Sequence, residues 1–240
     1  MIRSNATIPN ASVESALANI SRRDSKPDVE VWRTRLQRLQ ALPGASNKLR
    51  QVAETRNAEQ LADFLAECLF ALVFAGLGHI VELEPVGDIG PDLRVSRNGA
   101  DAFVEVTRFR SIYPGPKLAS GTMEDTLPPY GNVERDINKV YAKALSKLHQ
   151  LKLGASILAF WNDDADLEEI EASEAASCLL EDSRQGGSPL PPGLLFTVYS
   201  SANINVRQRT QIYCSPLQTL AYPYSCWLTD LDRSLIADLV

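Results

Sequence analysis

The sequence predicts an α/β fold in which a mixed central sheet is flanked by helices and preceded by a helical N-terminal segment. Patterns with the period of a helix and patterns with the period of a strand follow one another from about residue 57 to residue 215. The dipeptide Asn98-Gly99, a strong hairpin signal, joins two of the strand patterns. Hydrophobic residues make up 45% of the 240-residue chain, which is enough for a sizeable core.

The chain before this region divides into two segments. Residues 1–28 are rich in Ser, Asn and Ala and show little periodicity, so we expect a mobile or weakly helical arm. Residues 29–56 are predicted to be a helical N-terminal segment, in which Pro43-Gly44 ends the first helix. The apolar residues of that helix recur with helical spacing, at Val29, Trp32, Leu36 and Leu39. Residues 57–240 are expected to form the α/β domain.

This domain is predicted to begin with a buried helix from about Ala58 to Ala75. Asn57 is a suitable N-cap, and glycines follow the last turn. Residues 64–77 carry a single charged side chain, Glu67, so the helix is expected to be buried on most sides.

The remaining elements alternate between strand and helix patterns. Three strands are predicted over residues 79–86, 91–97 and 100–109, followed by a Pro/Gly-rich loop. An amphipathic helix over 132–152, a strand over 155–161, an acidic helix over 166–181 and strands over 194–200 and 208–214 complete the chain. This order points to a mixed sheet with helices packed against it.

Composition excludes several classes of protein. No apolar run is long enough to span a membrane, and residues 1–23 lack the apolar region of a secretory signal. Four widely spaced cysteines and two histidines do not suggest a zinc site, so we expect reduced thiols and a cytoplasmic location. The net charge of −6 is unevenly distributed: residues 30–56 are basic, whereas residues 163–182 are acidic.

Two carboxylates are expected to face each other across the hairpin. If Asn98-Gly99 is a two-residue turn, Leu93 lies opposite Val104 on an apolar face, and Asp92 lies opposite Glu105 on the other face. Directly opposed side chains have Cβ atoms about 4.5–5.5 Å apart, and two like charges there destabilise a sheet. A hard divalent cation with oxygen ligands would relieve that repulsion.

This stretch resembles the core of the PD-(D/E)xK, or restriction endonuclease-like, nuclease superfamily. The family signature is Pro-Asp, a spacer that crosses a hairpin, and then Glu-x-Lys on the next strand. The chain offers Pro91-Asp92, the hairpin and Glu105-Val106-Thr107, with Glu67 in the preceding helix and a further helix after the hairpin. The resemblance covers roughly residues 60–165, and its specificity comes from this context more than from the short motif.

The resemblance implies a metal-dependent nuclease that hydrolyses phosphodiester bonds in nucleic acid, with DNA as the expected substrate. Asp92 and Glu105 would hold Mg²⁺ or Mn²⁺ with the backbone carbonyl of Val106, and Glu67 would add a ligand. Thr107 occupies the catalytic position where the family has lysine, and it cannot supply a cation. Family members recruit such a lysine from neighbouring elements. Candidates here are Arg108, Arg110, Lys139 and Lys143.

Basic side chains on the helix after the hairpin suggest a nucleic-acid surface. Four of them recur every four residues and form one stripe, at Arg135, Lys139, Lys143 and Lys147. Such a stripe can contact successive phosphates and release counterions, and the arginine-rich helix at residues 33–38 could add to it. The expected partner is DNA, no membrane partner is expected, and a homodimer is compatible with the sequence.

Other interpretations of the same residues remain open. Asp92 and Glu105 could be solvated surface carboxylates, Glu67 a polar residue that reaches solvent, and the lysine stripe an ordinary solvated helix face. Thr107 favours a catalytically inactive nuclease-like fold that acts as a nucleic-acid-binding or protein-interaction module. A third hypothesis is an interaction protein that works through its acidic helix at residues 163–182.

Overall fold

The protein is described here from a computed structural model. The structure describes residues 11–23, 29–87, 90–109, 133–151, 154–162, 169–191, 195–200, 212–216 and 227. Its helices are α1 (Ala11–Arg23), α2 (Val29–Leu39), α3 (Ala45–Glu54), α4 (Ala58–Gly76), α5 (Val133–Lys147), the short 3-10 helix η1 (Leu148–Gln150) and α6 (Glu169–Arg184). Its strands are β1 (Ile80–Leu83), β2 (Leu93–Arg97), β3 (Ala100–Phe109), β4 (Ser156–Asn162), β5 (Leu195–Ser200) and β6 (Ile212–Pro216).

The strands form one mixed sheet with the order β1-β2-β3-β4-β5-β6. Strands β1, β2 and β3 pair antiparallel, β3, β4 and β5 pair parallel, and β6 returns antiparallel to β5. The connection from β3 to its parallel neighbour β4 contains helix α5, as a parallel crossover requires. The prediction of an α/β fold with a mixed sheet is confirmed.

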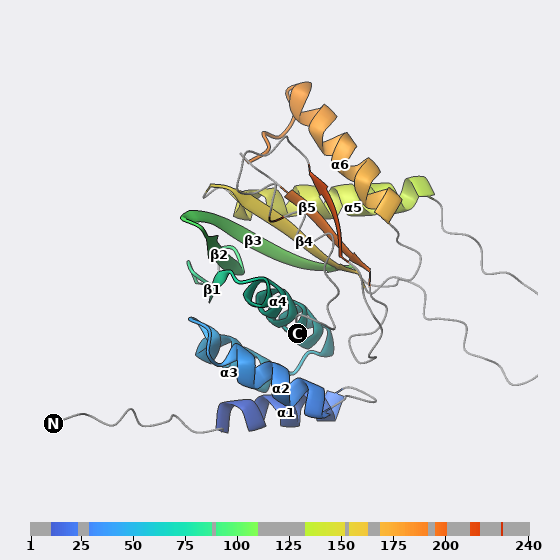
Figure 1. Cartoon of the computed structure of the whole chain (residues 1–240). Helices are drawn as coiled ribbons and strands as arrows, with labels where there is room; N and C mark the ends of the chain where they lie inside the picture. The colour runs from blue at the N-terminus through green and yellow to red at the C-terminus, as the bar shows by residue number, and fades with distance from the viewer. Residues whose placement is uncertain are drawn as a thin grey trace, which may run out of the picture.

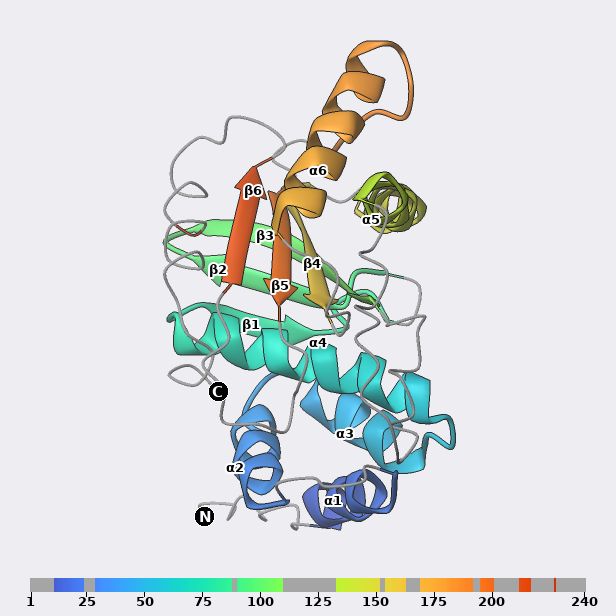
Figure 2. The same ribbon diagram turned by 90° about the vertical axis from the view of Figure 1, so that its right-hand side faces the viewer.

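Helices cover both faces of the sheet (Figures 1 and 2). Helix α4 packs on one face and separates the sheet from α1, α2 and α3, whereas α5 and α6 pack on the other. Strand β4 shows the division because its side chains alternate. Ile157 and Ala159 belong to the core beneath α4, whereas Leu158 and Phe160 belong to the core beneath α5 and α6.

Helix α4 begins where its sequence predicts. The side chain of Asn57 accepts hydrogen bonds from the backbone N–H groups of Glu59, at 2.9 Å, and Gln60, at 3.4 Å. From Leu65 to Phe74 every side chain is buried, because the sheet covers one side of the helix and the N-terminal helices cover the other. The predicted burial of this helix on most sides is confirmed.

The N-terminal helices belong to the same core as the sheet. A single hydrophobic cluster runs from Val13 of α1, through Trp32 of α2 and Leu49 of α3, to Trp161 of β4. Residues 1–28 were expected to be a mobile or weakly helical arm; residues 11–23 are helical, but they form a packed amphipathic helix and are not a mobile arm. The low hydrophobicity of that segment concealed its short apolar stripe. The rest of the expected arm lies outside the described residues.

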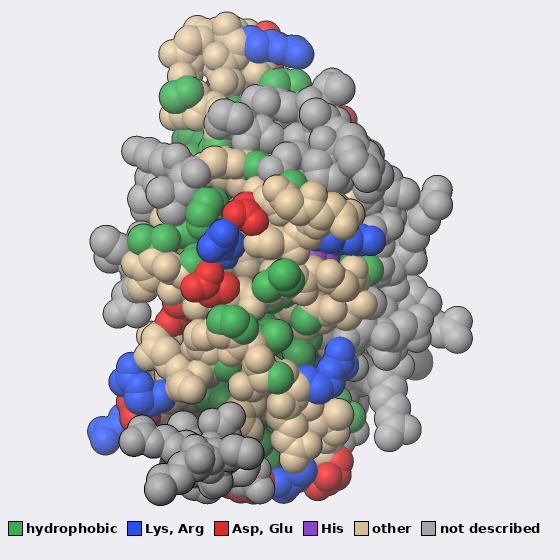
Figure 3. Space-filling model, turned by 60° about the vertical axis from the view of Figure 1, so that its left-hand side comes forward, with side chains coloured by type: hydrophobic (Ala, Val, Ile, Leu, Met, Phe, Trp, Pro, Cys, Tyr) green, Lys and Arg blue, Asp and Glu red, His purple; other side chains and the backbone are tan. Residues whose placement is uncertain are grey.

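The described surface carries charges of both signs. Arg94, on the outer side of the hairpin, pairs with Asp101 at 2.7 Å and with Glu82 at 3.6 Å. Figure 3 shows acidic and basic side chains next to one another on the face it presents. No helix in the described part of the chain combines the length and the apolarity needed to cross a lipid bilayer.

Candidate active site

The hairpin register places the two predicted carboxylates opposite each other. Leu93 pairs with Val104, and Arg97 pairs with Ala100, as a two-residue turn requires. Asn98 and Gly99 both have positive φ angles, of 55° and 77°, which is the conformation of a type I′ turn. One step beyond the last ladder pair, the same register sets Asp92 against Glu105. The predicted register of the hairpin is confirmed.

Asp92 is fixed by two backbone hydrogen bonds at the start of β2. The N–H of Val106 donates to its Oδ2 at 2.7 Å, and the N–H of Glu84 donates to its carbonyl oxygen at 2.7 Å. The Oδ2 atom of Asp92 thus accepts the Val106 N–H, a backbone group that a carbonyl oxygen of a neighbouring strand would otherwise pair with. This hydrogen bond does not involve Oδ1, the second carboxylate oxygen of Asp92.

The difference in length between β2 and β3 opens a cavity at this point. Pairing between the two strands stops at Leu93 and Val104, whereas β3 continues to Phe109 along β4. A cavity of about 540 Å³ lies beside this extension of β3. Its walls include charged side chains from five separate parts of the chain: Lys48, Glu67, Asp92, Glu105, Lys143 and Lys147.

Glu105 is buried, with 1% of its side chain exposed. Its Oε1 accepts a hydrogen bond from Nζ of Lys147 at 2.6 Å. Its Oε2 is also buried, and no donor for it is present among the residues that the structure describes. A buried carboxylate oxygen without a partner is costly, so this atom is a ready ligand for a cation.

Lys147 brings a positive charge to the face of β3 that carries Glu105 and Thr107. Thr107 is buried on the same face of β3 as Glu105, and Lys147 reaches that face from the last turn of α5. The candidates inferred from the sequence did not include Lys147 for this role. Arg108 points to the other face and pairs with Asp63, at 3.1 Å, and with Glu59, at 2.6 Å.

The other candidates for the missing lysine lie in different places. Lys143 lines the cavity, one turn before Lys147. Lys139 lies a further turn away, with its Nζ 6.0 Å from the centre of the Phe109 ring. Arg110 lies outside the described residues. By contrast, the ammonium group of Lys147, in the last turn of α5, contacts Glu105 directly at 2.6 Å.

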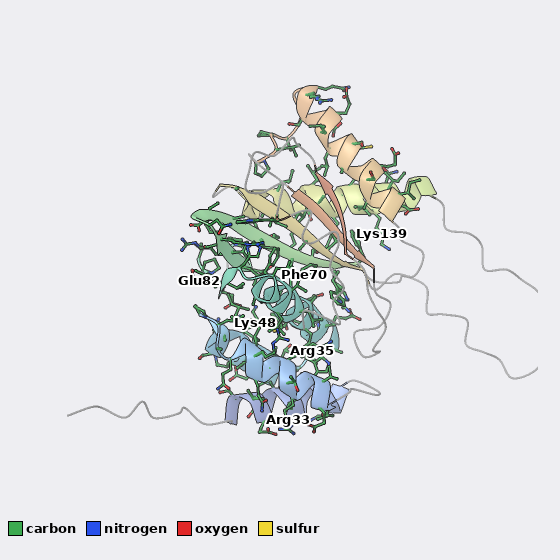
Figure 4. The ribbon with its side chains drawn as sticks, in the orientation of Figure 1. Arg33, Arg35, Lys48, Phe70, Glu82 and Lys139 are labelled. Carbon is green, nitrogen blue, oxygen red and sulfur yellow. The ribbon has the colours of Figure 1, made fainter. Side chains whose placement is uncertain are left out.

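Glu67 lies in the cavity wall, paired with a second buried lysine. Lys48 of α3 forms ion pairs with Glu67 of α4 and, at 2.6 Å, with Glu84, which follows β1. Figure 4 shows Lys48 between the N-terminal helices and α4. The sequence interpretation missed Lys48. The sequence contains one sign of its burial: Lys48 falls on the same face of the helix as the apolar residues Ala45, Leu49 and Val52.

The cavity has more negative than positive charge. Its lining carries five carboxylates and four basic groups, so one negative charge remains if all are ionised: the acids are Asp63, Glu67, Glu84, Asp92 and Glu105, and the bases are Lys48, Arg108, Lys143 and Lys147. Burial and the charge of Glu105 raise the pKa of Asp92 to about 7. Burial and the charge of Asp92 raise the pKa of Glu67 to about 8, against the effect of Lys48. The site therefore favours uptake of a proton or a cation.

The two lysines remain charged. Burial alone would lower the pKa of Lys48, but its ion pairs outweigh that effect and raise it. The same balance holds at Lys147, where burial opposes the charge and the hydrogen bond of Glu105, and the pKa rises. Burial raises the pKa of Glu105, although its bond to Lys147 works against this.

The donor chemistry of the cavity suits a hard divalent cation. The atoms that could act as metal ligands are carboxylate oxygens, including Oε2 of Glu105, which has no hydrogen-bond partner among the described residues. In the described part of the chain, no three His, Cys, Asp or Glu side chains are grouped so that they could hold a metal ion. In the same cavity Glu67 pairs with Lys48, and Glu105 pairs with Lys147. Mg²⁺ commonly needs only one or two protein carboxylates, with water and phosphate as its other ligands.

The predicted basic stripe leads toward the cavity. Lys139, Lys143 and Lys147 follow one another along α5, and the last two line the cavity. The side chain of Arg135 lies outside the described residues. The arginine-rich helix α2 is different, because Arg33 pairs with Glu14 and Arg35 lies 5.0 Å from the ring of Trp32. The first contact ties α2 to α1, and the second lies within α2.

No family model, no curated protein and no solved structure matches the chain. The function must therefore be inferred from the chemistry of the cavity.

Proposed function

We propose that the protein is a metal-dependent nuclease of the PD-(D/E)xK type in which Lys147 replaces the lysine of the motif. The observation that carries the proposal is the pairing of Lys147 with Glu105 at 2.6 Å, next to Asp92 and to a carboxylate oxygen that has no donor in the described part. An acid pair and an ammonium group in one cavity are the components that hydrolysis of a phosphodiester needs.

The order of elements supports the same family. Helix α4, the hairpin of β2 and β3, helix α5 and the parallel strand β4 follow one another as the restriction endonuclease-like core requires. Each part of the proposed site comes from its expected element, except that the lysine comes from α5 and not from β3.

Asp92 and Glu105 are the residues that would hold Mg²⁺ or Mn²⁺. When bound there, the ion would polarise the scissile phosphate and lower the pKa of the attacking water. The backbone N–H of Val106 keeps Asp92 in place through its bond to Oδ2. That bond leaves the other oxygen of Asp92 for the ion.

Lys147 has two roles in this scheme. It orients Glu105 through Oε1, and it places a positive charge where negative charge develops on the phosphate during cleavage. Lys143, one turn earlier and also in the cavity wall, would contact the nucleic-acid backbone. We propose DNA as the substrate and the cytoplasm as the place where it is met.

Cleavage of supercoiled plasmid in Mg²⁺ or Mn²⁺ tests the proposal. We expect nicked or linear product with the native protein, and none after addition of EDTA or with Asp92→Asn. The amide oxygen of asparagine can still accept the Val106 N–H, so this variant should fold. Asp101→Asn is the matched control, since Asp101 lies on the same hairpin and pairs with Arg94 outside the cavity. Cleavage that Asp92→Asn leaves intact would contradict the proposal.

A second candidate is a nuclease-like fold that binds nucleic acid without cleaving it. Thr107 favours it, and so do the two lysines that already neutralise Glu67 and Glu105. Salt-dependent binding of DNA with no cleavage in either metal, at any pH from 6 to 9 as a rough working range, would select this candidate.

A further inference from the structure

Lys48 occupies an unusual position for a charged residue. Only 2% of its side chain is exposed, and its ammonium group lies between the carboxylates of Glu67 and Glu84. Its Nζ also lies 4.9 Å from the centre of the Phe64 ring. A lysine held in this way acts as a fixed positive charge inside the protein.

The backbone around Lys48 is clamped to the end of β1. The N–H of Leu83 donates to the carbonyl oxygen of Pro43 at 2.9 Å, and the side chain of Asn47 donates to Glu84. Glu84 itself has a φ angle of 49°, a left-handed conformation that is strained for a residue other than glycine. Helix α3 is thus held in place by bonds that also fix one acid beside Lys48.

The two lysines divide the carboxylates of the cavity into two groups. Lys48 satisfies Glu67 and Glu84, while Lys147 satisfies one oxygen of Glu105. What remains is Asp92 and the buried Oε2 of Glu105, which has no donor in the described part. A single divalent cation matches this remainder in ligand type, because both remaining groups are carboxylate oxygens. A second cation would need Glu67, which Lys48 already holds.

We propose that Lys48 takes the place of a second divalent cation, so that the site binds one metal ion and Glu67 is a partner of Lys48 and not a metal ligand. This inference rests on the proposed function, because it assumes that Asp92 and Glu105 bind a metal. It changes the role expected for Glu67 from its place in the motif. It also makes α3 part of the site.

The number of bound ions is the measurement that tests this inference. Mn²⁺ titration of the intact chain, followed by calorimetry and by the loss of the free-ion signal in electron paramagnetic resonance, gives the stoichiometry without any substrate. We expect one ion for the native protein and for Lys48→Arg, which keeps the charge. Lys48→Met releases Glu67 and Glu84, and we expect it to bind a second ion.

A pair of matched variants decides the question if Lys48→Met does not fold. Glu67→Gln and Glu84→Gln each remove one negative charge from the partners of Lys48. If neither residue is a metal ligand, both variants keep one Mn²⁺ and weaken its binding equally, by about threefold or less. A loss of more than about 100-fold in Glu67→Gln alone, beyond the range typical of an outer-shell partner, would identify Glu67 as a ligand and overturn the inference.

The outcomes separate this inference from the proposed function. Two ions bound to the native protein, or one ion in a folded Lys48→Met variant, would reject the role of Lys48 and leave the nuclease proposal standing. No ion bound to the native protein, with Asp92→Asn indistinguishable from it, would remove the nuclease proposal and this inference together. Circular dichroism of each variant shows whether it is folded before it is counted.

Discussion

The ammonium group of Lys147 lies 2.6 Å from Oε1 of Glu105, although the two residues are 42 positions apart in the sequence. Glu105 sits on β3, and Lys147 ends the helix that crosses from β3 to β4. The helix that follows β3 in the chain therefore places its last lysine, Lys147, beside β3 itself. The positive charge on the face of β3 that carries Thr107 therefore comes from Lys147, which is placed there by the packing of α5 against the sheet.

Replacing Lys147 with methionine should abolish most cleavage. We expect the single-turnover rate in Mn²⁺ to fall by about 10²-fold or more, because a positive charge is lost where the transition state needs one. The metal-free protein should also lose about 3 kcal/mol of unfolding free energy, since Glu105 is left buried without a partner. Lys147→Arg should recover part of both losses. Equal rates for Lys147→Met and the native protein would refute the role of Lys147.

The stability of the metal-free protein should decrease as the pH rises. The folded state raises the pKa of Asp92 from 3.8 to about 7 and that of Glu67 from 4.5 to about 8. Folding therefore favours their protonated forms, and the stability that these groups contribute is complete below about pH 4 and lost as the pH passes 7 to 8. Urea denaturation in EDTA between pH 5 and 8 measures the trend. Glu67→Gln combined with Asp92→Asn should flatten it, and a rise in stability would contradict the prediction.

The lysines of α5 should set the salt dependence of DNA binding. If Lys139 and Lys143 each contact a phosphate, replacing either with alanine should reduce the slope of log K against log salt concentration by about 0.9. Fluorescence anisotropy with a labelled duplex, titrated in EDTA at several salt concentrations, measures the slope. Arg50→Ala serves as the control, because Arg50 is exposed on α3 and pairs with Glu54. Identical slopes for all variants would exclude α5 as the binding surface.

Gly44 should be much less tolerant of substitution than Gly78. Both have a φ angle of 82°, so alanine at either position costs about 1 kcal/mol in backbone strain. A Cβ at Gly44 would also overlap the carbonyl oxygen of Leu83, whereas a Cβ at Gly78 would meet no atom within 4 Å. We expect Gly44→Ala to lose at least about 2 kcal/mol more than Gly78→Ala in urea denaturation. Equal losses of unfolding free energy in the two variants would contradict this prediction and show that Leu83 can move away from a Cβ at Gly44 at little cost.

The parts of the site that depend on local pairing could be predicted from the sequence. The Asn98-Gly99 turn fixes the register, and the register sets Asp92 opposite Glu105 because side chains alternate with a period of two. The burial of α4 followed in the same way from its lack of charge, since its one acid between residues 64 and 77 is Glu67. These relations hold within one or two neighbouring elements.

The parts that depend on how helices dock could not be predicted in this way. The sequence shows a lysine every four residues on α5, but only the docking of that helix decides that Lys147 reaches Glu105 and that Lys139 does not. Lys48 is brought to Glu67 by the packing of α3 against α4, two helices whose contact leaves no mark in the motif. A lysine on an apolar stripe is the single local sign of it.

The position of Lys48 has a consequence for where the working unit begins. A shortened chain that started at residue 57 would retain every residue of the recognised motif, yet it would leave Glu67 and Glu84 inside the protein without their counter-ion. The underside of α4 would lose its cover at the same time. A search for relatives should therefore look beyond the motif itself, for a buried lysine that precedes the helix glutamate by 19 positions.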